Sequence, residues 1–351
     1  MLKTFAPSFL VTIIAAIGSF FWLGPDAAAV VLILIVLEVS LSFDNAVVNA
    51  TVLERMSPWW QKVFLTVGIF VAVFGMRFLF PILIVTATAQ IAPGEVLNLA
   101  FNDKAAYAAH LLDAHSAIAA FGGAFLMMIA LDFIFEDKEH MWLKRIEATF
   151  ARLGGIEGLS VSITLIVIVL SGNYLDPEKA STILLSGVLG VVTYLLVNGL
   201  AGFFEVSADE DDEEAAGISG ESGRARGAVA ATGKAAFFLF MYLEVLDASF
   251  SFDGVIGAFA ISNDIVVIAL GLGVGALYVR SLTIYLVRQG TLSEYVFLEH
   301  GAHYAIGALA VLLFTSMKYE IPEIVTGLIG VAFIFAALMS SIRKNKAEAV
   351  S

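Results

Sequence analysis

Long apolar stretches recur along the whole chain and alternate with short polar segments. Several exceed the roughly 18 residues that a helix needs to cross a bilayer, and a helix satisfies its own backbone hydrogen bonds there. The pattern predicts membrane-spanning helices rather than a barrel. We expect ten spans, at residues 8–23, 28–53, 63–88, 115–135, 154–172, 181–204, 236–261, 265–287, 302–317 and 322–341.

Composition supports an all-α polytopic membrane protein. Hydrophobic residues make up 60% of the chain and charged residues only 15%, whereas a soluble domain carries about 25% charged residues. The absence of cysteine excludes disulfides, thiolate metal sites and thiol redox chemistry. The first span resembles a signal peptide, with Lys3 before it and AAA (27–29) after it, but we expect it to be retained.

Basic residues are distributed unevenly between the two sets of loops. With the N-terminus inside, fourteen of the 19 Lys and Arg fall in cytoplasmic segments, and only Lys104, Lys179 and Lys318 fall in outer loops. Cytoplasmic loops of membrane proteins carry such an excess. We therefore expect a multi-pass protein with both termini in the cytoplasm.

An acidic motif occurs twice, as EVSLSFDNAVVNA (38–50) and within EVLDASFSFDGVIGAF (244–259). Similar segments follow each copy. The alignment pairs Glu38 with Asp247, Ser42 with Ser251, Asp44 with Asp253, Arg77 with Arg280, His115 with His303 and Asp132 with Glu320. Spans two to four thus match spans seven to nine. An odd number of helices per half implies a 5+5 inverted-topology repeat, which is common in secondary transporters.

One membrane domain is expected, built from residues 1–204 and 235–351, which form the two five-helix halves. The connecting segment 205–234 is strongly acidic and then rich in Gly, Ser and Ala, a composition typical of a disordered cytoplasmic linker. Its functional alternative is a docking site for cytoplasmic stress proteins. Segment 136–155 is basic, amphipathic and contains Trp, which predicts a helix at the membrane interface.

Acids outnumber bases within the expected spans. The acids are Glu38, Asp44, Asp132, Glu244, Asp247 and Asp253, and the bases are Arg77 and Arg280. A charge at the bilayer centre costs at least about 2.5–3.5 kcal/mol on insertion scales. Even if both arginines pair, four acids require protons or bound cations. The simpler alternative is that the acids pair with the arginines and only hold the helices together.

The two motif aspartates, Asp44 and Asp253, fall near the middle of their spans, where inverted-repeat carriers bind substrate. We expect a helix break at each motif, because Ser42 and Ser251 can bond to their own backbone and Gly254 weakens a helix. Carboxylate, amide and hydroxyl oxygens suit a hard divalent ion such as Mn²⁺, Mg²⁺ or Ca²⁺. Protonation of the same carboxylates offers a route for coupling.

The motifs E-V-S-L-S-F-D-N (38–45) and D-A-S-F-S-F-D (247–253), with KYEIPE (318–323) before the last span, resemble the TerC family of bacterial integral membrane proteins. The resemblance covers residues 28–136 and 236–341, although the second motif continues as GVIGA where that family has an S-I-P-A-like stretch. It implies a carrier of the LysE-type group in the bacterial cytoplasmic membrane, associated with tellurium resistance and manganese export. It also implies a metal site formed by Glu38, Asp44, Asn45, Asp247 and Asp253.

We therefore expect a secondary transporter, not an enzyme, that exports a divalent cation, with Mn²⁺ favoured. The cation is substrate and no resident cofactor is expected; the other partner is the lipid bilayer, and nucleic acid is not a partner. Supporting or gating roles are expected for Ser42, Ser251, Glu244, Asp132, Arg77, Arg280, His115 and His303. One alternative is a non-transporting anchor for a tellurium-stress complex. Another is an intramembrane aspartyl protease, whose G-x-G-D and Y-D patterns are absent.

Overall fold

The computed structural model describes residues 2–138, 140–216, 231–262, 264–290, 294–319 and 321–348. Within these ranges the chain is helical, and its only β pairing is a single bridge between Met56 and Ala231. Side chains 201–216 and those of some residues inside helices, including Asp44, Ser251 and Asp253, lie outside the described part. The all-α class is confirmed for the described chain.

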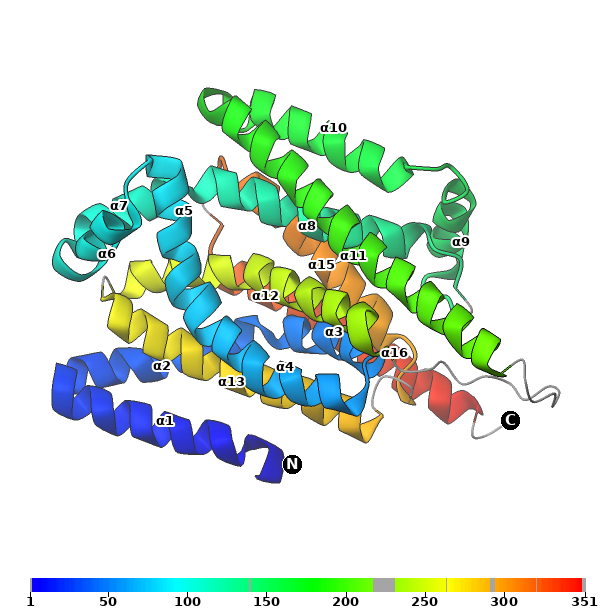
Figure 1. The fold of residues 1–351 in the computed structure, drawn as a ribbon, viewed down its shortest axis with the longest axis horizontal. Coiled ribbons are helices and arrows are strands. Elements are labelled where there is room, and N and C mark those ends of the chain that lie inside the picture. Colours follow the sequence, from blue (N-terminus) through cyan, green and yellow to red (C-terminus); the bar gives the residue numbers. More distant parts are fainter. Residues whose placement is uncertain are drawn as a thin grey trace.

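The helices follow the apolar stretches of the sequence (Figure 1). They are α1 (Leu2–Leu23), α2 (Pro25–Leu41), α3 (Phe43–Glu54), α4 (Pro58–Phe70), the π-helix η1 (Val71–Leu79), α5 (Phe80–Ala89), α6 (Pro93–Asn102), α7 (Lys104–Asp113), α8 (His115–Phe135), α9 (Lys144–Leu153), α10 (Leu159–Tyr174), the 3-10 helix η2 (Pro177–Lys179), α11 (Ala180–Ala216), α12 (Gly233–Ile261), α13 (Ile265–Gln289), α15 (Leu298–Ser316) and α16 (Glu323–Glu348).

Six helical stretches of the described chain are long and apolar enough to cross a membrane. They are Thr4–Leu23, Pro58–Ala87, His115–Phe135, Pro177–Leu200, Ile265–Gln289 and Val325–Ala347. α10 is apolar but shorter. α2 has only 17 residues, and α12 contains Glu244, Asp247 and Asp253. The chain is thus a membrane-spanning helical protein.

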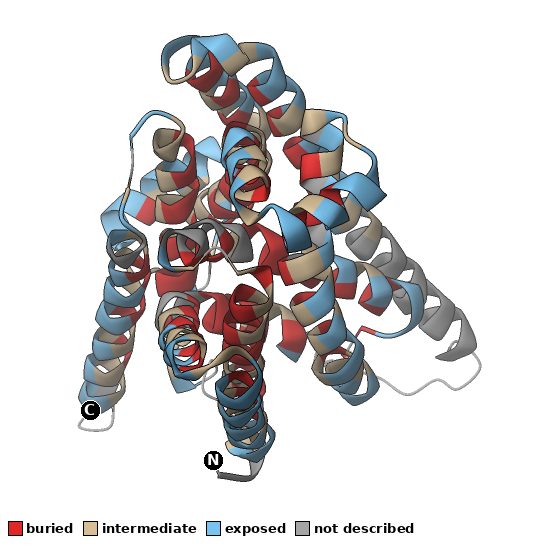
Figure 2. Cartoon of the chain, turned by 90° about the vertical axis from the view of Figure 1, so that its left-hand side faces the viewer, coloured by how far each residue is buried: buried red, intermediate tan, exposed pale blue. Residues whose placement is uncertain are grey.

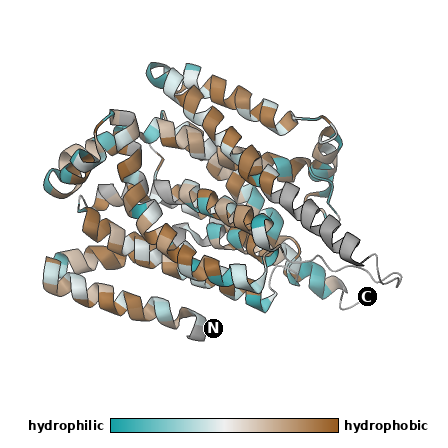
Figure 3. Ribbon diagram, in the orientation of Figure 1, coloured by the Kyte–Doolittle hydropathy of each residue, from teal (hydrophilic) through white to brown (hydrophobic). Residues whose placement is uncertain are grey.

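Apolar side chains cover the outer helices. Phe21 of α1 is 82% exposed, and Leu185 of α11 and Phe335 of α16 are also exposed. Figure 3 shows hydrophilic residues gathered around α9 at one end and around α6 and α7 at the other, with hydrophobic helices between them. Exposed apolar surface on this scale fits lipid as the solvent.

The interior is formed by helices from both ends of the sequence (Figure 2). α8 packs against α11 and α15, and α13 packs against α2. Gly122 and Gly123 let α8 approach Leu313 and Phe314 of α15 closely. His115, which begins α8, meets the end of α15, whereas Phe133 near the end of α8 stacks on His303 near the start of α15. These two central helices are therefore antiparallel.

The first acidic motif interrupts its helix, as predicted. α2 ends at Leu41 and α3 begins at Phe43, because Ser42 has φ −99° and ψ 20°. The matching prediction for the second motif is wrong, since α12 runs without a break through residues 251–254. α12 packs against α8 and α11, and Ser249 in this segment bonds the Val245 carbonyl one turn back without opening the helix.

Three further segments differ from, or refine, the expectations. α6 and α7 fold the loop between residues 90 and 114, which had no predicted helix. α11 continues through the acidic segment to Ala216, so its beginning is helical rather than a disordered linker, while residues 217–230 lie outside the described chain. α9 confirms a helix within 136–155, with Ile146 and Phe150 exposed on its apolar face.

Candidate functional site

The first buried ion pair joins α2 to η1. Glu38 and Arg77 are 1% and 2% exposed, and Arg77 Nη2 donates to Glu38 Oε1. Ser42 Oγ donates to the same oxygen at 3.2 Å. Arg77 Nη1 donates to the carbonyl of Ala72 at 2.8 Å, inside the π-helix. Such widened turns are rare and often occur at functional sites, and here the turn supplies a carbonyl that fixes the guanidinium.

A second buried arginine, Arg280 of α13, joins α4 and α12. Its Nη2 donates to both carboxylate oxygens of Glu244, at 3.1 and 3.2 Å, and lies 3.5 Å from Asp247 Oδ2. Its Nη1 donates to the carbonyl of Phe64 at 3.1 Å, and the guanidinium lies 4.0 Å above the Phe64 ring. Contact with both a carboxylate and an aromatic face suits a buried guanidinium.

Asn45 connects the two motifs directly. Its Nδ2 donates to Asp247 Oδ1 at 2.8 Å, which links α3 to α12. The carboxylate can only accept, so it fixes the amide with the nitrogen toward Asp247 and the oxygen away. Asn45 Oδ1 and Asp247 Oδ2 then remain buried without a hydrogen bond. The site therefore contains two oxygen atoms with unused lone pairs.

Glycines bring the helices close enough to assemble these groups. A Cβ added at Gly275 of α13 would lie 2.5 Å from both Cβ and Cγ of Glu38. One at Gly254 of α12 would lie 3.1 Å from Glu38 Oε2, and one at Gly68 of α4 would lie 2.8 Å from Glu244 Oε1. The absence of side chains at these positions creates the space that the carboxylates occupy.

The described side chains of this cluster carry an excess of acid. Glu38, Glu244 and Asp247 contribute −3 and Arg77 and Arg280 contribute +2, which leaves −1 when all are ionised. Asp44 precedes Asn45 in α3 and Asp253 follows Asp247 in α12, but their side chains lie outside the described part. Among the side chains that are described, no three His, Asp or Glu are grouped closely enough to hold a metal ion.

Comparison with known proteins places this chain in a family. Residues 43–348 match DUF475, a family described as proteins of unknown function. The chain belongs to the DUF475 family. No curated protein and no solved structure matches it. The matched region of this DUF475 chain runs from α3 into α16 and includes Asn45, Arg77, Asp247 and Arg280, whereas Glu38 precedes it.

Three further predicted residues of the DUF475 chain, Asp132, His115 and His303, make their printed contacts with residues outside the cluster. Asp132 is exposed near the end of α8 and accepts a hydrogen bond from Tyr194 at 2.5 Å. His115 Nε2 lies 3.3 Å from Ser316 Oγ. His303 stacks on Phe133 with 3.9 Å between ring centroids. Ser251 belongs with Asp44 and Asp253 among the residues whose side chains are not described.

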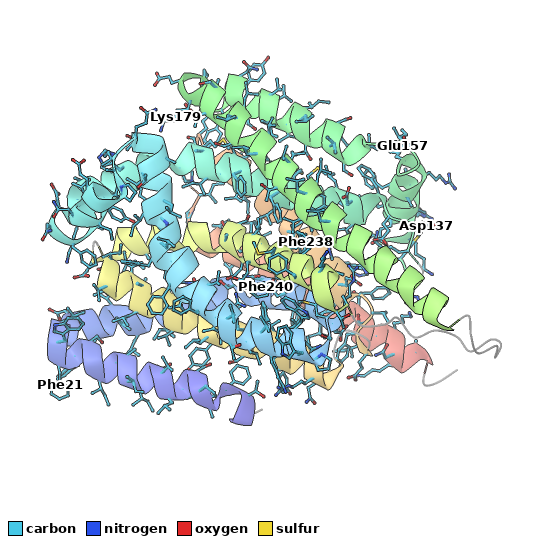
Figure 4. The ribbon with its side chains drawn as sticks, in the orientation of Figure 1. Phe21, Asp137, Glu157, Lys179, Phe238 and Phe240 are labelled. Atoms are coloured by element: carbon cyan, nitrogen blue, oxygen red, sulfur yellow. The ribbon has the colours of Figure 1, made fainter. Side chains whose placement is uncertain are left out.

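Two features were missed in the sequence. Asn49 is buried one turn after Asn45 and has no hydrogen-bond partner; its signal was the spacing of four residues, which places both amides on one helix face. The other is Glu147 of α9, which is 3% exposed. It accepts the N–H groups of Trp142 and Leu143 at 2.9 and 3.1 Å and the Tyr304 hydroxyl. Glu147 thereby fixes α9 against α15. Figure 4 shows Asp137 and Glu157 at this same end and Lys179 far from it.

Proposed function

We propose that this protein is a secondary transporter that exports a divalent metal cation, with Mn²⁺ as the favoured substrate, across the bacterial cytoplasmic membrane. The observation that carries the proposal is a pair of buried oxygens without a hydrogen bond, Asn45 Oδ1 and Asp247 Oδ2, within a cluster of excess acid in which Arg280, 3.5 Å from Asp247 Oδ2, is shared with Glu244. A buried oxygen without a hydrogen bond lowers the stability of the folded protein, and a bound cation would coordinate both oxygens. The resemblance to TerC proteins supports manganese and a role in metal or tellurium stress.

The donor chemistry supports a hard divalent ion. Carboxylate and amide oxygens are the ligands of Mg²⁺, Mn²⁺ and Ca²⁺, whereas softer ions prefer sulfur or imidazole. Asp44 and Asp253, adjacent in sequence to Asn45 and downstream of Asp247, would supply the remaining carboxylates. Between transport steps, Arg77 and Arg280 would neutralise the carboxylates of Glu38 and Asp247. When a metal ion or a proton binds to a carboxylate, it would replace the arginine as the positive partner.

An inverted repeat of ten spans is part of the proposal, and several contacts support it. Glu38–Arg77 and Asp247–Arg280 are the same pair in the two copies of the alignment. Asn45, which contacts Asp247, corresponds to Gly254, which lies against Glu38. The antiparallel contact of α8 with α15 also relates equivalent helices. The spans would be α1, α2 with α3, α4 to α5, α8, α10, α11, α12, α13, α15 and α16.

The proposed orientation rests on the ends of the helices together with the distribution of basic residues. The start of α1, α9, and the ends of α11 and α16 all lie toward one side of Figure 1, and α6 and α7 lie at the other. The basic segments of the sequence analysis belong to the first side, which we assign to the cytoplasm. The break at Ser42 would let α3 move relative to α2 during alternating access.

The main competing function is a non-transporting membrane anchor, in which the ion pairs only hold the helices together. A purely structural set of ion pairs gives no reason for Asn45 Oδ1 to be buried without a hydrogen bond beside them, and this favours the carrier. An anchor would depend instead on the acidic segment. If the protein is an anchor, deletion of residues 207–226 should abolish stress protection. If it is a carrier, the same deletion should leave most of its metal export intact.

The decisive experiment measures Mn²⁺ uptake into liposomes that contain the purified protein, with Mg²⁺ and Ca²⁺ as comparison ions and an imposed pH gradient. Asp44→Asn and Asp253→Asn should each abolish uptake. Asp113→Asn is the matched control, because this aspartate of α7 is 82% exposed and only 3.5 Å from Lys179 at the surface; it should behave as wild type. Equal uptake by all three variants, or no uptake of any of these ions by the wild type, would refute the carrier.

A further inference from the structure

Asn49 is a buried amide without any hydrogen bond. Its side chain is 1% exposed, and neither Oδ1 nor Nδ2 has a partner in the described part of the structure. Almost all buried polar side-chain atoms in proteins have partners, because leaving one unpaired destabilises the folded state. Both polar atoms of Asn49 are therefore free to bind water or an ion, as far as the described residues are concerned.

The position of Asn49 places it next to the proposed cation site. It follows Asn45 by four residues in α3, so both side chains lie on the same helix face about 6 Å apart along the axis. Asn45 bonds Asp247 and keeps its own Oδ1 unpaired. The two amides thus form a short polar row that leads away from the acidic cluster, and the residues between them, Ala46, Val47 and Val48, are apolar and buried.

The row leads toward the end that we assign to the cytoplasm. α3 finishes at Glu54, and Glu54 lies close enough to Glu299 of α15 for their charges to interact. The charge of Glu299 also interacts with the negative charge of Glu136 and with the positive charges of Lys138 and Arg55. A cation that leaves the cytoplasm would meet these carboxylates first, Asn49 next and the Asn45–Asp247 pair last.

We propose that Asn49 forms a second cation subsite, one helix turn on the cytoplasmic side of Asn45 and Asp247, that takes a partly hydrated hard divalent cation. This subsite rests on the proposed transport function. Oδ1 accepts from the cation's bound water or coordinates the cation directly, and Nδ2 donates to a further water molecule. A neutral amide offers oxygen ligation without adding charge, so the ion can move on to the carboxylates.

The test replaces Asn49 by Leu, which has the same branching but no hydrogen-bonding atoms, and measures Mn²⁺ uptake in liposomes and thermal unfolding with and without MnCl₂. Uptake should show a KM at least tenfold higher than wild type, with a smaller change in kcat. The metal-free protein should be as stable as wild type or more stable, and its stabilisation by MnCl₂ should fall. Asn49→Ser, which keeps a smaller oxygen, should give an intermediate KM and serves if the Leu variant does not fold.

The matched control is Thr51→Val on the same helix, which removes a hydroxyl that already donates to the Val48 carbonyl at 2.7 Å. It should leave KM within twofold of wild type. If Asn49→Leu is more stable and its KM is unchanged while Asp44→Asn abolishes uptake, Asn49 is an unpaired structural amide and only the subsite is rejected. If the wild type transports no divalent ion, the transport function and the subsite both fall.

Discussion

Gly275→Ala should disrupt the site through packing alone. The added Cβ would lie 2.5 Å from Cβ and Cγ of Glu38 and 3.4 Å from the carbonyl oxygen of Ile35. Carbon atoms in contact are separated by about 3.5–4.0 Å, so two contacts are too short by about 1 Å or more. Both atoms lie at the base of the Glu38 side chain, where rotation gives little relief, and α13 must move away from α2.

The magnitude follows from two opposing effects. Overpacking a buried site costs typically about 1–3 kcal/mol, whereas alanine in a helix returns up to about 1 kcal/mol relative to glycine. We expect a net loss of about 1–2 kcal/mol in the free energy of unfolding. The displaced Glu38 should also lose its bond to Arg77, so that transport falls together with stability.

The assay is reversible unfolding in mixed micelles followed by circular dichroism. Gly18→Ala in α1 is the matched control, because nothing lies within 4 Å of its added Cβ; the same substitution should there stabilise by about 0.5–1 kcal/mol. The two variants should therefore differ in sign. If Gly275→Ala is as stable as Gly18→Ala, the close approach of α13 to Glu38 is wrong.

Three further outcomes follow from the described contacts. Arg280→Leu leaves Glu244 and Asp247 without their counter-charge and should cost about 3–5 kcal/mol in unfolding free energy. The double variant with Glu244→Leu should recover part of this loss, because Asp247 then keeps only the hydrogen bond from Asn45; a double variant no more stable than Arg280→Leu would contradict the pairing. Tyr304→Phe removes a hydrogen bond to the buried Glu147 and should cost about 1.5–3 kcal/mol and expose residues 136–143 to faster proteolysis; an unchanged cleavage rate would argue against this attachment of α9. For Asp264, partial burial alone would raise the pKa, but the Lys104 ammonium and the N–H groups of Val266 and Val267 outweigh it and lower the pKa below its usual 3.8. The carboxylate then stabilises the fold above its unfolded pKa, and this contribution disappears as pH falls through the lowered value. Thermal unfolding between pH 2 and 6 should lose part of its pH dependence in Asp264→Asn; identical profiles would refute the assignment.

Much of the fold could be predicted from the length of the apolar stretches in the sequence. The span 115–135 was predicted with the bounds of α8, because residues 117–131 form an uninterrupted apolar run and charged residues follow at 136–139. The helices α6 and α7 were missed because polar residues such as Glu95, Asn98, Asn102 and Asp103 divide the segment between residues 90 and 114 into apolar runs too short to span a membrane. These helices pack mainly on each other and on α5. The helical start of the acidic segment up to Ala216 reflects the helix propensity of Glu and Ala, which charge-based reasoning about linkers overlooked.

The sequence indicated which charged residues lie within the helices, but not which side chains contact one another. The count of charges within the expected spans included Glu38, Glu244, Asp247, Arg77 and Arg280, because charges in an apolar medium are rare and usually paired. The same count included Asp132, which is exposed and bonds Tyr194 instead. The sequence could not show that Asn45 bridges to Asp247 or that Arg280 bonds Glu244 more closely than Asp247. Those choices depend on where α3, α12 and α13 cross.

The two halves contribute unequal chemistry to the proposed transport path. In the alignment of the two motifs, Asn45 and Asn49 correspond to Gly254 and Ala258. The first half thus supplies amides where the second supplies small residues, and Gly254 serves to admit Glu38. A carrier with two identical halves would present the same ligands to both sides of the membrane. Among the described residues that the alignment pairs, the buried amide oxygens belong to Asn45 and Asn49 of α3, so we expect the two access states of the proposed carrier to bind the cation with different affinities.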